Sequence, residues 1–167
     1  MPSGARAAPD SSMIKAVFDT NLLVSAFLSR NNPGAVSNEL LRFVIAGGID
    51  LYLSVDIADE MVATLLGKER TRRKYRYSAD DVGQYRADLM TLATIVDDPA
   101  ALPGAVPRDP DDDKIIACAV AASVQYIVSR DNHLLSLGSY GGIPITAPEQ
   151  FIHLVRQDFG RLPDQQS

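Results

Sequence analysis

Acidic residues stand at four separated points of this 167-residue chain, and carboxylates gathered in one place support a limited range of chemistry. These residues are Asp19, Glu60, the adjacent Asp112 and Asp113, and Asp131. Carboxylates that lie close together repel one another unless a cation neutralises them, and Mg²⁺ or Mn²⁺ suits a site made of oxygen ligands. One or two such ions can activate water and stabilise charge on a phosphodiester. If the fold brings the four points together, we expect a metal-dependent hydrolase.

Other kinds of site have few residues to draw on. Cys118 is the one cysteine of the chain, which excludes an internal disulfide and a cysteine-built zinc site. His133 and His153 are too few for a three-histidine metal site, and we interpret both as surface or helix-end residues. We therefore expect any metal to be held by oxygen atoms.

Strands alternate with helices along the chain, and this order would place the acidic residues at one edge of a sheet. It favours an α/β fold, a three-layer α/β/α arrangement around a mostly parallel central sheet of four to five strands. Asp19 and Asp131 each follow an expected strand, and Asp112 begins an expected helix that points to the same edge. We expect strands at 14–18, 49–54, 94–96, 126–129 and 143–146, and helices at 22–28, 35–46, 55–66, 78–93, 112–123, 132–137 and from 148 to about 156.

Each carboxylate taken singly also has a structural interpretation. Asp19 and Asp131 could cap the helices that follow them. Asp112 and Asp113 could complement a helix dipole. Glu60 faces away from the apolar stripe of its helix, so it could line a cleft or simply meet water.

The composition is that of one globular domain. Apolar residues make up 46% of the chain and charged residues 22%, which argues against disorder. We expect a domain over residues 13–156, with a flexible N-terminal tail at 1–12 and a flexible C-terminal tail at 157–167. No apolar run approaches the ~18–20 residues that span a bilayer, and the first residues contain no apolar segment typical of a signal peptide. We therefore expect a cytoplasmic protein without a membrane partner.

The charge of the chain is unevenly distributed. The net charge is −5, yet residues 68–76, here called the basic strip, carry six basic side chains and one acidic one. The strip could be a solvated loop or helix end, or it could contact phosphates, with Tyr75 and Tyr77 as stacking platforms for bases. Its basic residues are Lys68, Arg70, Arg72, Arg73, Lys74 and Arg76.

Four acidic motifs, in this order, resemble those of PIN-domain proteins over roughly residues 13–155. They are AVFDTN at 16–21, SVDIADE at 54–60, DPDDDKIIA at 109–117 and IVSRD at 127–131. The closing IPI at 143–145 and PEQF at 148–151 are similar to the VapC-like ribonucleases, the toxin components of bacterial toxin–antitoxin systems. The resemblance implies a Mg²⁺- or Mn²⁺-dependent endoribonuclease that cleaves RNA, is commonly a homodimer and is often inhibited by an antitoxin.

The resemblance also implies roles for individual residues. Carried over by position, the metal-binding carboxylates are Asp19, Glu60, Asp131 and one or both of Asp112 and Asp113. The spacing to Asp131 favours Asp113, whereas an Asp-Asn-Lys variant of the motif favours Asp112, so both stay open.

Supporting polar groups are implied as well. They are Thr20 or Asn21, together with Ser129. The basic strip falls where the family inserts a helical pair, which makes it a candidate for contact with the RNA backbone.

Three other functions compete with this one. A catalytically idle PIN-like module would act by binding another protein, and a metal-dependent DNA nuclease would share the chemistry. A flap-type DNA nuclease usually has longer inserted segments than this chain. A phosphatase of the haloacid-dehalogenase type needs a second aspartate two residues after the first, where this chain has Asn21.

Overall fold

Six strands form one central sheet in this computed structural model, which describes residues 13–97, 99, 112–160 and 162. The strand order is β3-β2-β1-β4-β6-β5, and every neighbouring pair is parallel except β5 and β6. The strands are β1 (Ile14–Phe18), β2 (Ile49–Ser54), β3 (Thr94–Val96), β4 (Tyr126–Val128), β5 (Ser139–Tyr140) and β6 (Ile143–Thr146).

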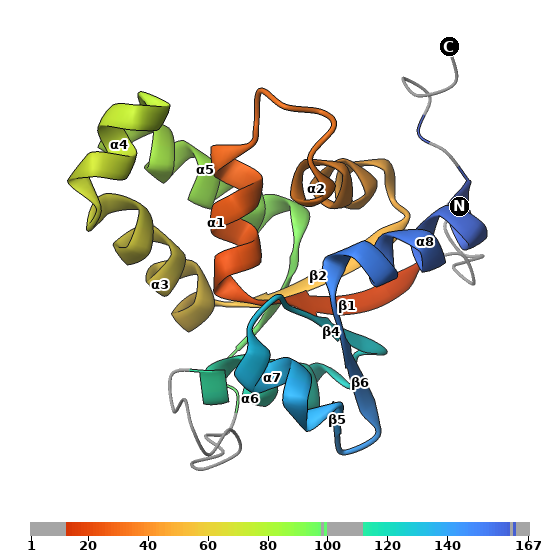
Figure 1. Cartoon of the computed structure of the whole chain (residues 1–167). Coiled ribbons are helices and arrows are strands. Elements are labelled where there is room, and N and C mark those ends of the chain that lie inside the picture. The colour runs from red at the N-terminus through yellow and green to blue at the C-terminus, as the bar shows by residue number, and fades with distance from the viewer. Residues whose placement is uncertain (1–12, 98, 100–111, 161, 163–167) are drawn as a thin grey trace, which may run out of the picture.

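Helices cover both faces of the sheet, so the expected three-layer α/β/α fold is confirmed. Figure 1 shows α6 and α7 below the sheet and α1, α2 and α3 above it, and α8 packs against α2. In the described part of the chain, no helix is long and apolar enough to cross a membrane. The helices are α1 (Thr20–Leu28), α2 (Val36–Ala46), α3 (Val55–Leu66), α4 (Glu69–Tyr75), α5 (Ala79–Leu92), α6 (Asp113–Ala122), α7 (Asn132–Leu137) and α8 (Pro148–Phe159).

The expectation of four to five strands was wrong by one. The additional strand, β5, has two residues and pairs with β6 across a turn at Gly141 and Gly142, both of which have positive φ. A strand this short carries no alternating pattern in the sequence.

The last helix, α8, also runs beyond its expected end near Arg156, as far as Phe159. The ring of Phe159 packs edge-on against the ring of Phe43, with 5.7 Å between the ring centres. The predicted N-terminal tail lies outside the described residues, as does most of the predicted C-terminal one.

The centre of the sheet fixes where the functional edge lies. β1 runs between β2 and β4, and its last three residues are buried, which is typical of a parallel strand covered on both faces. Phe18 is in register with Val128, so the residues that follow them, Asp19 and Ser129, leave the sheet side by side. The backbone N–H of Asp19 donates to the carbonyl of Val128 at 2.9 Å and extends this pairing by one residue.

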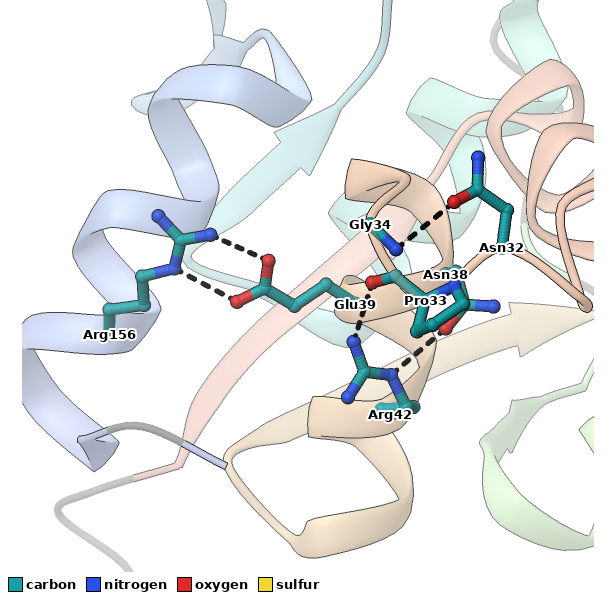
Figure 2. Close-up of polar contacts among 7 residues, drawn as sticks. All are labelled: Asn32, Pro33, Gly34, Asn38, Glu39, Arg42 and Arg156. Carbon is teal, nitrogen blue, oxygen red and sulfur yellow. Dashed lines mark hydrogen bonds and ion pairs between the residues drawn. The ribbon is translucent and has the colours of Figure 1, made fainter. Parts of the chain in front are cut away.

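A paired carboxylate and guanidinium join α2 to α8 (Figure 2). Arg156 Nε donates to Glu39 Oε2 at 2.9 Å, and Arg156 Nη2 donates to Glu39 Oε1 at 2.6 Å. The Glu39 side chain is 5% exposed, and that of Arg156 is 38% exposed. The hydrogen bonds to Glu39 raise the pKa of Arg156 above its usual range. Figure 2 also shows Arg42, which donates to the Asn38 side chain and to the Pro33 carbonyl and so fastens the loop before α2.

This pair predicts an unequal response to mutation. Arg156→Met leaves the Glu39 carboxylate buried without its partner and is expected to lower the free energy of unfolding by about 3–5 kcal/mol. Glu39→Gln leaves an arginine that reaches water, so the expected loss is about 1–2 kcal/mol. Urea denaturation of both variants at pH 7 measures the difference, and an equal or reversed order would contradict this account.

Candidate metal centre

Three aspartates from distant parts of the chain converge at the carboxyl edge of the sheet. Asp19, Asp112 and Asp131 each offer a carboxylate oxygen, and these oxygens lie within 4.8 Å of one another. Each aspartate is the N-cap residue of a helix: Asp19 precedes α1, Asp112 precedes α6 and Asp131 precedes α7. Asp19 and Asp112 are buried, and Asp131 is half-buried. We call these three residues the aspartate cluster.

Ser129 connects two members of the cluster. Its fully buried hydroxyl donates to Asp19 Oδ2 at 2.6 Å and accepts from the backbone N–H of Asp131 at 2.9 Å. Asp131 Oδ1 also accepts from the backbone N–H of His133 at 2.7 Å, so Asp131 does cap its helix. Asp19 also stands at the expected N-cap position of α1, although its side chain lacks the capping hydrogen bond that Asp131 has.

The electrostatics of the cluster favour a bound cation. Burial raises the pKa of Asp19 above its ordinary value, the Ser129 hydrogen bond lowers it in part, and the nearby Asp131 raises it further. A buried carboxylate beside a second one is costly to ionise unless a positive charge is present. The donor set consists of oxygen atoms, which suits Mg²⁺ or Mn²⁺. Next to Asp19, the Oγ1 atom of Thr20 is buried without a hydrogen-bond partner among the described residues, so a further oxygen is available there.

The other predicted carboxylates lie outside the cluster. Among the described residues, the group with metal-ligand spacing contains Asp112 and not Asp113, which is the first residue of α6 and is half-buried. Glu60 lies on α3, and its carboxylate forms an ion pair with the ammonium of Lys114 on α6. The role of Glu60 as a metal ligand stays a prediction. Asn21 is exposed on α1.

Lys114 is a residue of the site region that the sequence patterns do not single out. It stands directly after the adjacent aspartates in the run DDDK, and this position was the available signal. The partner of Lys114 lies 54 positions away, so only the packing of α3 on α6 reveals their contact.

The basic strip forms a surface feature. Its central part is α4, none of whose residues is buried, and α4 packs against α3. Tyr75 is 40% exposed, with the Lys74 ammonium 5.3 Å from its ring centre. Tyr77 is 6% exposed and donates its hydroxyl to the Leu65 carbonyl at 2.7 Å, so the interpretation of Tyr77 as a stacking platform is wrong.

The raised pKa of Asp19 predicts how its replacement changes stability with pH. Because the folded-state pKa lies above the ordinary value of 3.8, the charged form destabilises the metal-free protein at neutral pH. This penalty disappears as the pH falls through the folded pKa towards 3.8. Asp19→Asn removes the charge and keeps an oxygen that accepts from Ser129, so it should unfold at a higher temperature than the wild type at pH 7.

Thermal unfolding in a chelator between pH 7 and pH 4 measures this effect. We expect the advantage of Asp19→Asn to shrink as the pH falls. An advantage that grows towards low pH, or a variant less stable than the wild type at pH 7, would contradict the electrostatic interpretation.

Comparisons with known proteins identify the family. A family model described as a PIN domain matches residues 15–133. No curated protein matches the chain. A chain of similar fold occurs in a solved structure described as VapBC2 from Rickettsia felis bound to a DNA fragment from their promoter. The TM-score is 0.54 and the sequence identity is 12%, and the match covers 80% of this chain and 98% of the Rickettsia felis chain. At this identity the likeness shows the fold alone. Because the family model spans more than half of the chain, including all three residues of the aspartate cluster, the chain belongs to the PIN-domain family.

Proposed function

We propose that this chain is an endoribonuclease that depends on Mg²⁺ or Mn²⁺ and serves as the toxin of a type II toxin–antitoxin pair. The observation that carries the proposal is the convergence of Asp19, Asp112 and Asp131 at the carboxyl edge of the sheet. PIN domains are generally metal-dependent nucleases, and this donor set suits one or two divalent ions.

The residues of the cluster have distinct roles in this proposal. Asp19, Asp112 and Asp131 hold the ion, and Ser129 orients the Asp19 carboxylate while it fixes the backbone at Asp131. When bound, the ion supplies Lewis acidity and activation of water for phosphodiester hydrolysis. Burial of Asp19 shields that carboxylate from water, so a cation bound there interacts with it more strongly than in water.

RNA is the proposed substrate, and the basic strip is its proposed second contact. Most cations of the strip are exposed on or beside α4 and can neutralise phosphates, whereas Arg72 is half-buried. The exposed ring of Tyr75 offers a face on which a base can stack. The acidic remainder of the chain repels RNA, so RNA is expected to bind mainly at the basic strip and at a metal ion held by the aspartate cluster.

A cytoplasmic antitoxin protein is the proposed partner, because the similar chain from Rickettsia felis belongs to a VapBC2 complex of toxin and antitoxin. A hollow of about 390 Å³ between α1, α2 and α5, lined by apolar and charged side chains, provides a surface for such a protein, and none of its lining residues belongs to the aspartate cluster. Ile45, on its rim, is 62% exposed. Homodimer formation stays a prediction.

Cleavage of a mixed single-stranded RNA tests the enzymatic part of the proposal. We expect cutting with Mg²⁺ or Mn²⁺ and none in a chelator. Asp19→Asn should lose more than ~100-fold in rate and Ser129→Ala about 10–100-fold, because ligands matter more than the groups that orient them. Asp158→Asn, an exposed position on α8, is the matched control and should cut at the wild-type rate.

The alternatives give different results in the same assay. Cutting that survives the chelator, or that is unchanged in Asp19→Asn, would contradict the proposed site. Cutting of single-stranded DNA but not of RNA would identify a DNA nuclease. Folded, inhibitor-free protein that cuts neither would support a binding module.

A further inference from the structure

Lys114 is a cation at the start of α6, the helix whose N-cap residue is Asp112. It is the second residue of α6, two positions after Asp112. Its ammonium contacts Glu60 Oε2, and the two side chains are 29% and 30% exposed. Neither charged end is therefore sealed from solvent.

The ammonium keeps capacity for a second partner. A lysine ammonium has three N–H donors, and Glu60 is the one partner of Lys114 in the described part of the chain. A carboxylate on one side of the ammonium holds it in place and leaves the remaining donors directed elsewhere. An ammonium held in this way can also donate to an anion.

Other cations of the region are placed differently. Arg130 lies between Ser129 and Asp131 in sequence, but its guanidinium binds Glu149 on α8 through Nε at 3.2 Å and Nη2 at 2.5 Å. The basic strip lies on α4, beyond α3. The three carboxylates of the cluster repel a phosphate, so a substrate phosphate held there benefits from a cation of the protein itself.

We propose that Lys114, positioned by Glu60, binds a non-bridging oxygen of the RNA phosphate at the aspartate cluster. This inference rests on the proposed function, since it names a group that recognises the substrate of that same site. In this proposal Glu60 positions Lys114 and is not the metal ligand that the sequence resemblance implies, so the metal affinity is set by Asp19, Asp112 and Asp131.

RNA binding tests the proposal without cleavage of the substrate. The affinity for a fluorescent single-stranded RNA is measured by anisotropy with Ca²⁺ in place of Mn²⁺, and gels verify that the RNA stays intact. Lys114→Gln keeps a donor for Glu60 but removes the charge, and it should raise the dissociation constant about 5–10-fold. The slope of log affinity against log salt should fall by about 0.7, the value for one phosphate contact on a single strand. Lys114→Arg should restore affinity to within about threefold.

Two further variants distinguish phosphate binding by Lys114 from a general effect of surface charge and from metal ligation by Glu60. Lys15→Ala removes an exposed lysine on β1, distant in the strand from the carboxyl edge, and should leave RNA affinity unchanged. Glu60→Gln should weaken RNA binding while the Mn²⁺ dissociation constant, measured by calorimetry, stays within about twofold of the wild type.

Specific results would overturn the proposal. Unchanged RNA affinity in Lys114→Gln, with a lowered melting temperature, would make the pair with Glu60 purely structural. A tenfold or greater loss of Mn²⁺ affinity in Glu60→Gln would make Glu60 a metal ligand and Lys114 its counter-ion. These outcomes are distinguishable from failure of the proposed function, which is read from RNA cleavage by the wild type.

Discussion

Repulsion among the carboxylates of Asp19, Asp112 and Asp131 is the constraint around which this end of the molecule is organised. Their oxygens lie within 4.8 Å of one another, and two of the three residues are buried. The fold holds them there because β1 and β4 are parallel neighbours that end in register, so that Asp19 and Asp131 leave the sheet at the same edge. The stability gained by the apolar strands offsets the cost of keeping these charges together in the absence of a cation.

Local features of the chain reduce that cost. Each aspartate stands at the N-terminus of a helix, where the backbone N–H groups carry partial positive charge. The Ser129 hydroxyl donates to Asp19, and the ion pair of Glu60 with Lys114 keeps a fourth carboxylate neutralised outside the cluster. The same features that lower the free-energy cost of the carboxylate repulsion in the metal-free protein would orient the ligands for a divalent ion. Stability and function are therefore expected to oppose each other at Asp19.

Most of the fold could be predicted from the sequence, but fewer of the contacts at the candidate site could be. Mainly apolar segments indicate the central strands β1 and β4, and at the start of α5 the structure has a reciprocal capping box between Ser78 and Asp81. The two-residue strand β5 gave no such signal.

At the site, the expected strand topology was enough to predict that Asp19 and Asp131 lie at the same edge of the sheet. The choice between Asp112 and Asp113 could not be made, because consecutive positions on a helix differ by ~100° in direction and the helix start was uncertain by one residue. The partner of Glu60 was also hidden, since it depends on how two helices pack.

The most direct test of this account is a crystal structure of the protein grown with Mn²⁺, with anomalous diffraction data to locate the metal. The account predicts an anomalous peak at the carboxyl edge of the sheet, with oxygens of Asp19, Asp112 and Asp131 as ligands at about 2.0–2.3 Å. A peak elsewhere on the protein, or well-ordered crystals in which the three carboxylates bind no Mn²⁺, would contradict it.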